Sequence, residues 1–156
     1  MEVTISKTGI VSTIERQNMW MQEIERKHIL YFGCYTGLGK TSQAEFLAES
    51  NYSCWIRLHG ESEALYTDFI TWNQKQQEKK RLVIIDNLSY LLEQEEKKKQ
   101  VIKIIEEKIT IGGFDLILIG RAEIPGWLHT FRSAGLLKCY GVENFILSNE
   151  EVDKII

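Results

Sequence analysis

A glycine-containing segment at residues 34–41 constrains the fold of this chain more than any other feature of its sequence. It follows a short apolar run at residues 29–32 and leads into a stretch of helix-forming residues. Gly39, Lys40 and Thr41 match the end of the phosphate-binding loop pattern, GxxxxGK followed by Ser or Thr, whose backbone amides surround an anion. Such a loop joins a strand to a helix, so the pattern predicts a strand–loop–helix unit here.

The residues of this loop have different tasks. Gly37 and Gly39 let the backbone come close to the phosphates. Lys40 is expected to contact the β- and γ-phosphates, and the Thr41 hydroxyl is expected to ligate Mg²⁺. A glycine turn beside a surface lysine is the weaker interpretation, because strand and helix patterns flank the loop. The predicted nucleotide-binding residues are Cys34, Tyr35, Thr36, Gly37, Leu38, Gly39, Lys40, Thr41 and Ser42.

Cys34 departs from the pattern, which usually has glycine at that position. A small side chain is tolerated there when the backbone angles are ordinary. We interpret Cys34 as an inert buried cysteine rather than a redox-sensitive thiol, because free cysteines are among the most buried residues.

A second candidate site residue, Asp86, directly follows an apolar run. An aspartate in this place beside a phosphate-binding loop holds Mg²⁺, so Thr41 and Asp86 are the predicted metal residues. Asn87 comes next, where a carboxylate would be the natural base for an attacking water. Because an amide does not accept that proton, we predict slow hydrolysis unless Glu61, Glu63 or a partner group substitutes.

Arg121 follows another apolar run, residues 114–119, after a single glycine. The carboxyl ends of parallel strands share one crevice, so Arg121 would reach a γ-phosphate bound there and report its presence. A solvated strand-end arginine, or a surface ion pair with Glu123, explains the same residue equally well. The predicted catalytic group is Asp86, Asn87 and Arg121.

Strand and helix patterns alternate along the chain. The continuous hydrophobicity of the apolar runs indicates strands covered on both faces, as a parallel sheet requires. We therefore predict an α/β, three-layer P-loop NTPase domain with a central, mainly parallel five-stranded sheet flanked by helices. The predicted strands are residues 29–32, 54–58, 82–85, 114–119 and 145–147, and the predicted helices are residues 10–25, 40–48, 61–76, the stretch around 102–109 and a short one after Pro125.

We expect one domain over residues 1–147. Ser148 and Glu151 form a capping-box pattern, so residues 148–156 are expected to begin a lid or helical segment. The charge-dense residues 93–99 are interpreted as the solvated start of a helix, with acids first and lysines later as the helix dipole prefers.

The composition excludes several classes of protein. The 156 residues include 19 Lys and Arg against 22 Asp and Glu, and the formal net charge of -3 makes a poor nucleic-acid binder by charge alone. The three cysteines are far apart without a CxxC pattern, which disfavours a disulfide framework and a zinc ribbon. No apolar run has the length of a membrane span. We predict a cytoplasmic protein that binds neither membranes nor, by itself, DNA.

Together these motifs resemble the nucleotide-binding domain of the large ATP-binding LuxR-type transcriptional regulators, the MalT-like group of signal-transducing STAND ATPases. The resemblance covers nearly the whole chain and is most diagnostic over residues 119–149, where an arginine, Pro-x-Trp-Leu, a second arginine and a strand leading to Ser-x-Glu-Glu follow one another. The matching segments are GLGKTSQAEFLAES, CWIRLHGESEALYTDF, LVIIDNL, LILIGRAEIPGWLHTFRSAGLLKCYG and FILSNEEV.

The resemblance implies ATP or ADP with Mg²⁺ as cofactors. By it, Lys40 and Thr41 would bind phosphate and Mg²⁺, Asp86 would be the metal aspartate, and Arg121 would be the γ-phosphate sensor. Three positions depart from the group's usual residues: Cys34 in the loop, Asn87 where a second acid is usual, and Gly120 where a serine is common.

The resemblance also implies further domains of a longer regulator: the rest of the lid, superhelical repeats that sense an inducer, and a C-terminal helix-turn-helix. The present chain is then an N-terminal ATP/ADP-binding switch module with slow or no hydrolysis of its own. Self-association on activation is implied as well, whereas the isolated module could stay monomeric. Two alternatives remain open, a small P-loop phosphotransferase and an interaction module whose degenerate loop no longer turns over nucleotide.

Overall fold

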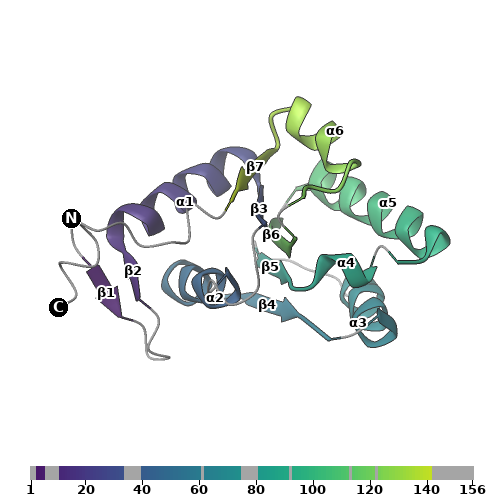
Figure 1. Cartoon of the computed structure of the whole chain (residues 1–156), viewed down its shortest axis with the longest axis horizontal. Coiled ribbons are helices and arrows are strands. Elements are labelled where there is room, and N and C mark those ends of the chain that lie inside the picture. Colours follow the sequence, from purple (N-terminus) through teal and green to yellow (C-terminus); the bar gives the residue numbers. More distant parts are fainter. Residues whose placement is uncertain are drawn as a thin grey trace.

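The structure, a computed structural model, describes residues 3–5, 11–33, 40–60, 62–74, 81–91, 93–112, 114–121 and 123–141. They form a central sheet, a separate two-stranded sheet and several helices (Figure 1). In chain order the elements are β1 (Val3–Ile5), β2 (Val11–Thr13), α1 (Ile14–Lys27), β3 (Ile29–Gly33), α2 (Lys40–Asn51), β4 (Trp55–Leu58), α3 (Ser62–Gln74), β5 (Arg81–Ile85), α4 (Leu88–Leu91), α5 (Glu95–Ile111), β6 (Phe114–Gly120), α6 (Leu128–Ser133) and β7 (Leu137–Tyr140).

The central sheet has five strands in the order β4-β5-β6-β3-β7, and every neighbouring pair is parallel. β3 and β6 are buried almost throughout, because helices cover both faces of the sheet (Figure 1). The predicted α/β fold with a five-stranded parallel sheet is confirmed. Since β6 lies between β3 and β5, its carboxyl end lies between the end of β3 and Asp86, which follows β5.

Alternate residues of the strands belong to two separate cores. On one face of the sheet, Leu30 and Phe32 of β3 pack with residues of α1 and α2. On the other face, Ile29 and Tyr31 of the same strand pack with residues of α3, α4, α5 and α6. Successive side chains of a strand point to opposite faces, so one apolar run supplies both cores.

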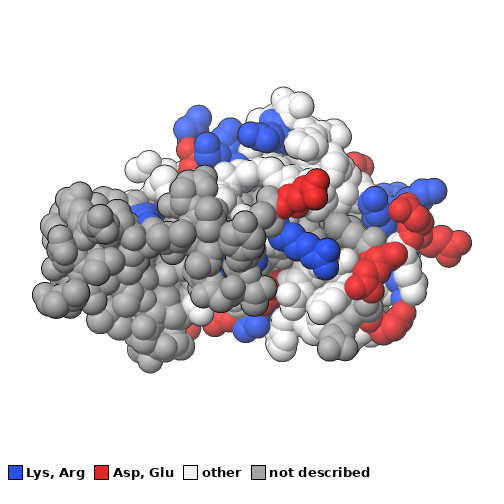
Figure 2. All heavy atoms as spheres, in the orientation of Figure 1, with Lys and Arg blue, Asp and Glu red and all other residues white. Residues whose placement is uncertain are grey.

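One face of the described part of the molecule carries side chains of both charges. Figure 2 shows Lys and Arg side chains interspersed with Asp and Glu side chains over the half of the molecule that α3, α4, α5 and α6 form. Within the described ranges, none of the helices combines the length and the apolar character needed to cross a membrane.

Parts of the observed fold differ from the sequence prediction. The fifth strand of the sheet is β7, which was not predicted, whereas the strand expected at residues 145–147 and the helix start at Ser148 lie outside the described residues. β7 is an edge strand beside β3 with an exposed Lys138, so it lacks the continuous apolar run of a central strand. The first helix begins at Ile14, later than expected, since the three residues before it pair with β1 as β2.

A buried carboxylate near the amino end of β6 ties two helices to the sheet. It lies at the opposite end of the strands from Asp86. Asp115 of β6 is fully buried; its Oδ1 lies 3.0 Å from Nδ1 of His28, which follows α1, and its Oδ2 accepts a 2.7 Å hydrogen bond from the hydroxyl of Tyr52, which follows α2. Burial raises the pKa of Tyr52 and the hydrogen bond to Asp115 raises it further, so the phenol remains a donor. Asp115 therefore anchors the ends of both helices on this face of the sheet.

Replacing Asp115 with Asn is expected to lower the free energy of unfolding by about 1–3 kcal/mol, because the amide keeps the shape of the carboxylate but leaves one buried partner poorly satisfied. Urea denaturation followed by circular dichroism measures the change. Asp68→Asn, on the exposed side of α3, is the matched control and is expected to change the free energy by less than about 0.5 kcal/mol. Equal midpoints for the two variants would contradict the anchoring role.

Candidate functional site

The predicted helix after the phosphate-binding loop begins at Lys40, as the sequence pattern requires. The Lys40 ammonium donates a 2.8 Å hydrogen bond to the backbone carbonyl of Gly120, the last residue of β6. Ser42 is partly buried on the first turn of the same helix. The loop residues before Lys40 lie outside the described residues, and they are Cys34, Tyr35, Thr36, Gly37, Leu38 and Gly39.

The two predicted metal residues meet at this edge of the sheet. The Thr41 hydroxyl donates a 2.9 Å hydrogen bond to Oδ2 of Asp86, although the two residues are 45 positions apart in the sequence. The other carboxylate oxygen, Oδ1, accepts a 2.9 Å hydrogen bond from the backbone N–H of Asn87, and the backbone N–H of Asp86 donates to the carbonyl of Leu58 in β4. Asp86 is only 8% exposed, so its carboxylate is held in one orientation toward α2.

The chemistry of this pair fits a magnesium ion. Mg²⁺ prefers hard oxygen ligands and is usually held by one or two carboxylates together with substrate phosphates. Thr41 and Asp86 offer a hydroxyl and a carboxylate at one point. Within the described residues, no group of three or more His, Cys, Asp or Glu side chains is placed to hold a metal by itself. Waters and the phosphates of a bound ligand would therefore supply most of the remaining coordination of an ion at Asp86.

Sequence reasoning missed an arginine at the same carboxylate. Nη2 of Arg57, on β4, lies 3.2 Å from Oδ2 of Asp86, and Nη1 donates a 2.7 Å hydrogen bond to Oε1 of Glu45 on α2. Glu45 lies one helical turn after Thr41 and so on the same side of α2. The signal that would have found Arg57 is a charged residue inside the otherwise apolar run 54–58.

Two of the three residues considered for water activation, Asn87 and Glu63, lie within the described residues. Asn87 has a φ of 56°, a left-handed conformation that asparagine adopts more readily than most residues, and its side chain is exposed. Glu63, one suggested substitute base, instead accepts a hydrogen bond from Lys97 of α5. Glu61 lies outside the described residues. Asn87 thus follows Asp86 directly, whereas Glu63 is paired with Lys97.

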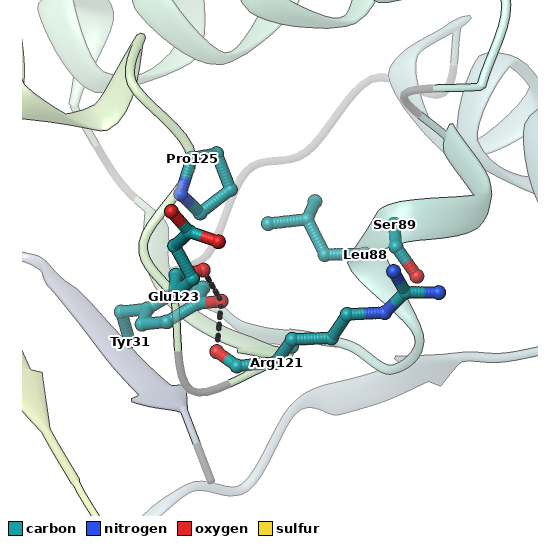
Figure 3. A pocket seen from close by; sticks show the side chains of 7 residues that line it. Tyr31, Leu88, Ser89, Arg121, Glu123 and Pro125 are labelled. Atoms are coloured by element: carbon teal, nitrogen blue, oxygen red, sulfur yellow. Dashed lines mark hydrogen bonds between the residues drawn. The ribbon is translucent and has the colours of Figure 1, made fainter.

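Arg121 lies at the turn after β6, next to a small pocket. Figure 3 shows its side chain extending away from Tyr31 toward Leu88 and Ser89 of α4. Within the described part of the chain, Arg121 and Glu123 form no ion pair, so that explanation of the arginine is not supported. The pocket has a volume of about 120 Å³, which is below the 300–1,000 Å³ typical of ligand sites, so it would not enclose a whole nucleotide. Its lining residues are Tyr31, Leu88, Ser89, Gly120, Arg121, Glu123 and Pro125.

Two glycines allow a tyrosine to hold this turn. Gly33 and Gly120 are register partners at the ends of β3 and β6. The buried Tyr31 hydroxyl donates a 2.7 Å hydrogen bond to the carbonyl of Arg121, and burial raises the pKa of Tyr31 to about 12, which keeps the phenol protonated. A Cβ at Gly33 would lie 2.5 Å from the Tyr31 ring and 2.6 Å from the Arg121 carbonyl oxygen. A Cβ at Gly120 would lie 2.5 Å from the Tyr31 hydroxyl, which gives a physical reason for the glycine found there.

No protein-family profile matches this sequence, and no curated protein matches it in sequence. Among solved structures, a Walker-type ATPase of Pyrococcus abyssi is similar with a TM-score of 0.56 and 14% identity, over 90% of this chain and 56% of that one. PCH-2 of C. elegans is similar with a TM-score of 0.49 and 12% identity, over 81% of this chain and 41% of that one. The chain shares the α/β fold, with its five-stranded parallel sheet, of that Walker-type ATPase. At these identities the likeness shows the fold alone, and the chain spans about half the length of the two proteins.

Gly33→Ala is expected to destabilise the protein by about 1–3 kcal/mol, because the new methyl group would overlap the backbone carbonyl of Arg121 and the Tyr31 ring. Thermal or urea unfolding measures the loss. Gly126→Ala is the matched control, since a Cβ there meets no atom within 4 Å. If the two alanine variants were equally stable, the close packing at the end of β3 would not constrain this turn.

Proposed function

We propose that this chain binds ATP and ADP together with Mg²⁺ at the carboxyl edge of its parallel sheet. The observation that carries the proposal is the hydrogen bond between Thr41 and Asp86, formed one residue after Lys40, whose ammonium contacts the end of the neighbouring strand β6. A hydroxyl, a carboxylate and an ammonium at the N-terminus of a helix are the groups that a magnesium polyphosphate needs. The fold similarity to a Walker-type ATPase supports the same function.

Each residue has a defined task in this proposal. Lys40 would exchange its hydrogen bond to the Gly120 carbonyl for the phosphates, where its charge gains more from an anion than from a neutral carbonyl. Thr41 and Asp86 would hold the metal ion, which neutralises phosphate charge when bound. Arg121 directly follows Gly120, whose carbonyl Lys40 contacts, so its side chain would turn from α4 toward a γ-phosphate bound near Lys40.

The finer proposal is a switch module within a signal-responsive transcriptional regulator. It rests on the sequence resemblance to the LuxR-type group, above all on residues 119–149. In such a module, ATP and ADP stabilise different arrangements of this domain against its neighbours, and the lid, repeat sensor and helix-turn-helix of the longer protein convert that difference into regulation. The module itself then contacts nucleotide and protein rather than DNA.

Lys40→Ala is expected to weaken ATP binding by about 10–100-fold, the equivalent of losing one or two charge-assisted hydrogen bonds. Isothermal titration calorimetry with Mg²⁺-ATP measures the affinity. Lys103→Ala removes the same charge from an exposed position on α5 and is expected to leave it unchanged. ATP affinity that is equal in Lys40→Ala and in the unmodified protein would remove the basis of the proposal.

The purified domain is expected to release phosphate from ATP very slowly, since the residue after Asp86 is Asn87, whose side-chain amide does not accept a proton where a base would be needed. Asn87→Asp is expected to raise the rate at least about tenfold, because aspartate also adopts the left-handed backbone conformation of this position. A coupled phosphate assay measures both rates. Rapid release by the unmodified domain would contradict this explanation.

A second candidate is an interaction module that no longer binds nucleotide. The observation that favours it is the contact between Arg57 and Asp86, which gives the metal carboxylate a positive partner from the protein itself. Titration with a fluorescent ATP analogue, with and without Mg²⁺, separates the two functions. Binding in the micromolar range favours the nucleotide module, and no binding in either condition favours the interaction module.

A further inference from the structure

One arginine joins two carboxylates that come from different elements of the site. Arg57 of β4 contacts Oε1 of Glu45 at 2.7 Å and Oδ2 of Asp86 at 3.2 Å. The Asp86 side chain is 11% exposed, compared with 34% for Arg57 and 24% for Glu45. The most buried charge of the three is therefore the one at which the metal is expected.

The guanidinium satisfies the same oxygen atom that faces Thr41. Oδ2 of Asp86 accepts hydrogen bonds from both the Thr41 hydroxyl and Nη2 of Arg57. A buried carboxylate is costly unless a positive or hydrogen-bonding group compensates it, and Arg57 supplies a charge that is never lost by deprotonation. The guanidinium would repel a divalent cation bound to this oxygen. The cation and Arg57 therefore cannot both contact Oδ2 at their preferred distances.

We propose that Arg57 competes with Mg²⁺ for Asp86 and that Glu45 retains the guanidinium when the metal takes its place. This inference rests on the metal site of the proposed function. Metal binding without nucleotide is weakened, because the ion must displace a built-in cation. Nucleotide phosphates add ligands to the ion and so favour Mg²⁺ over Arg57 at Asp86. Mg²⁺ therefore binds together with the nucleotide rather than before it.

The two contact lengths indicate which ion pair yields. The 2.7 Å bond to Glu45 is within the range of strong charge-assisted hydrogen bonds, whereas the 3.2 Å contact with Asp86 is longer and weaker. Glu45 and Thr41 lie one turn apart on α2, so a guanidinium that keeps only Glu45 stays beside the site. Arg57 can therefore leave Asp86 without leaving its strand or losing all its partners.

The test measures binding of Mn²⁺ alone, as a spectroscopic substitute for Mg²⁺, through the loss of the free-ion electron paramagnetic resonance signal. Arg57→Gln is expected to tighten Mn²⁺ binding roughly five- to tenfold, because one nearby positive charge is removed. Arg26→Gln removes the same charge from a side chain that is 72% exposed at the end of α1, and it is expected to change the affinity by less than about twofold. If Arg57→Gln bound Mn²⁺ no more tightly than Arg26→Gln, the competition would be disproved.

A double-mutant cycle tests the role of Glu45. Glu45→Gln leaves Asp86 as the remaining carboxylate contact of Arg57 in the described structure, so Mn²⁺ binding is expected to weaken about two- to threefold. The same substitution in the Arg57→Gln background is expected to have a clearly smaller effect, since no guanidinium is left to redirect. Equal weakening in both backgrounds would show that Glu45 acts on the ion directly and would overturn its role as the retaining partner.

A measurement on the unmodified protein does not depend on the folding of any variant. The side-chain resonances of Arg57 are expected to shift as Mg²⁺ is added, because one of its two ion pairs is lost. Unchanged resonances at saturating Mg²⁺ would contradict the proposal.

Adding ADP to the Mn²⁺ titrations separates this inference from the proposed function. Failure of ADP to bind any variant, together with tighter Mn²⁺ binding by Arg57→Gln, would reject nucleotide binding and support the competition. ADP binding, together with unchanged Mn²⁺ affinity in Arg57→Gln, would support nucleotide binding and reject the competition.

Discussion

The hydrogen bond between the Thr41 hydroxyl and the Asp86 carboxylate is the contact on which the organisation of the site depends. It joins the first turn of α2 to the end of β5, across the end of the intervening strand β6. The parallel sheet makes this contact possible, because parallel strands bring all their carboxyl ends to one edge. Lys40, one residue earlier, donates a hydrogen bond to the last carbonyl of β6.

Helix α2 is fastened at both ends by carboxylates of the sheet. Asp86 holds its first turn through Thr41, and Asp115 holds the residue after its last turn through Tyr52. These two contacts hold α2 against the sheet near both of its ends, with its N-terminus at the carboxyl ends of the strands. This is the preorganisation that an anion-binding helix N-terminus requires, since reordering the helix on binding would cost affinity.

The parts of the molecule that sequence reasoning predicted are those fixed by burial on both faces. The runs containing Leu30, Ile84 and Ile117 are continuous and apolar because helices cover both sides of β3, β5 and β6. β7 was not predicted because its four residues, Leu137–Tyr140, include the exposed Lys138 and form no continuous apolar run. The convergence of Thr41 and Asp86 follows from the motif, whereas the contact of Arg57 with Asp86 requires knowing that β4 pairs with β5, and no local pattern contains that information.

The packing of Tyr31 beneath the strand ends limits how this site can change over evolution. At position 120 the three atoms nearest to an added Cβ all belong to the Tyr31 side chain, so a smaller residue at 31 would remove the closest obstacle to serine or alanine. At position 33 a backbone oxygen also blocks the space, and no substitution at 31 removes it. Among descendants of this sequence, positions 31 and 120 should therefore vary as a pair, while position 33 should stay glycine whatever its neighbours become.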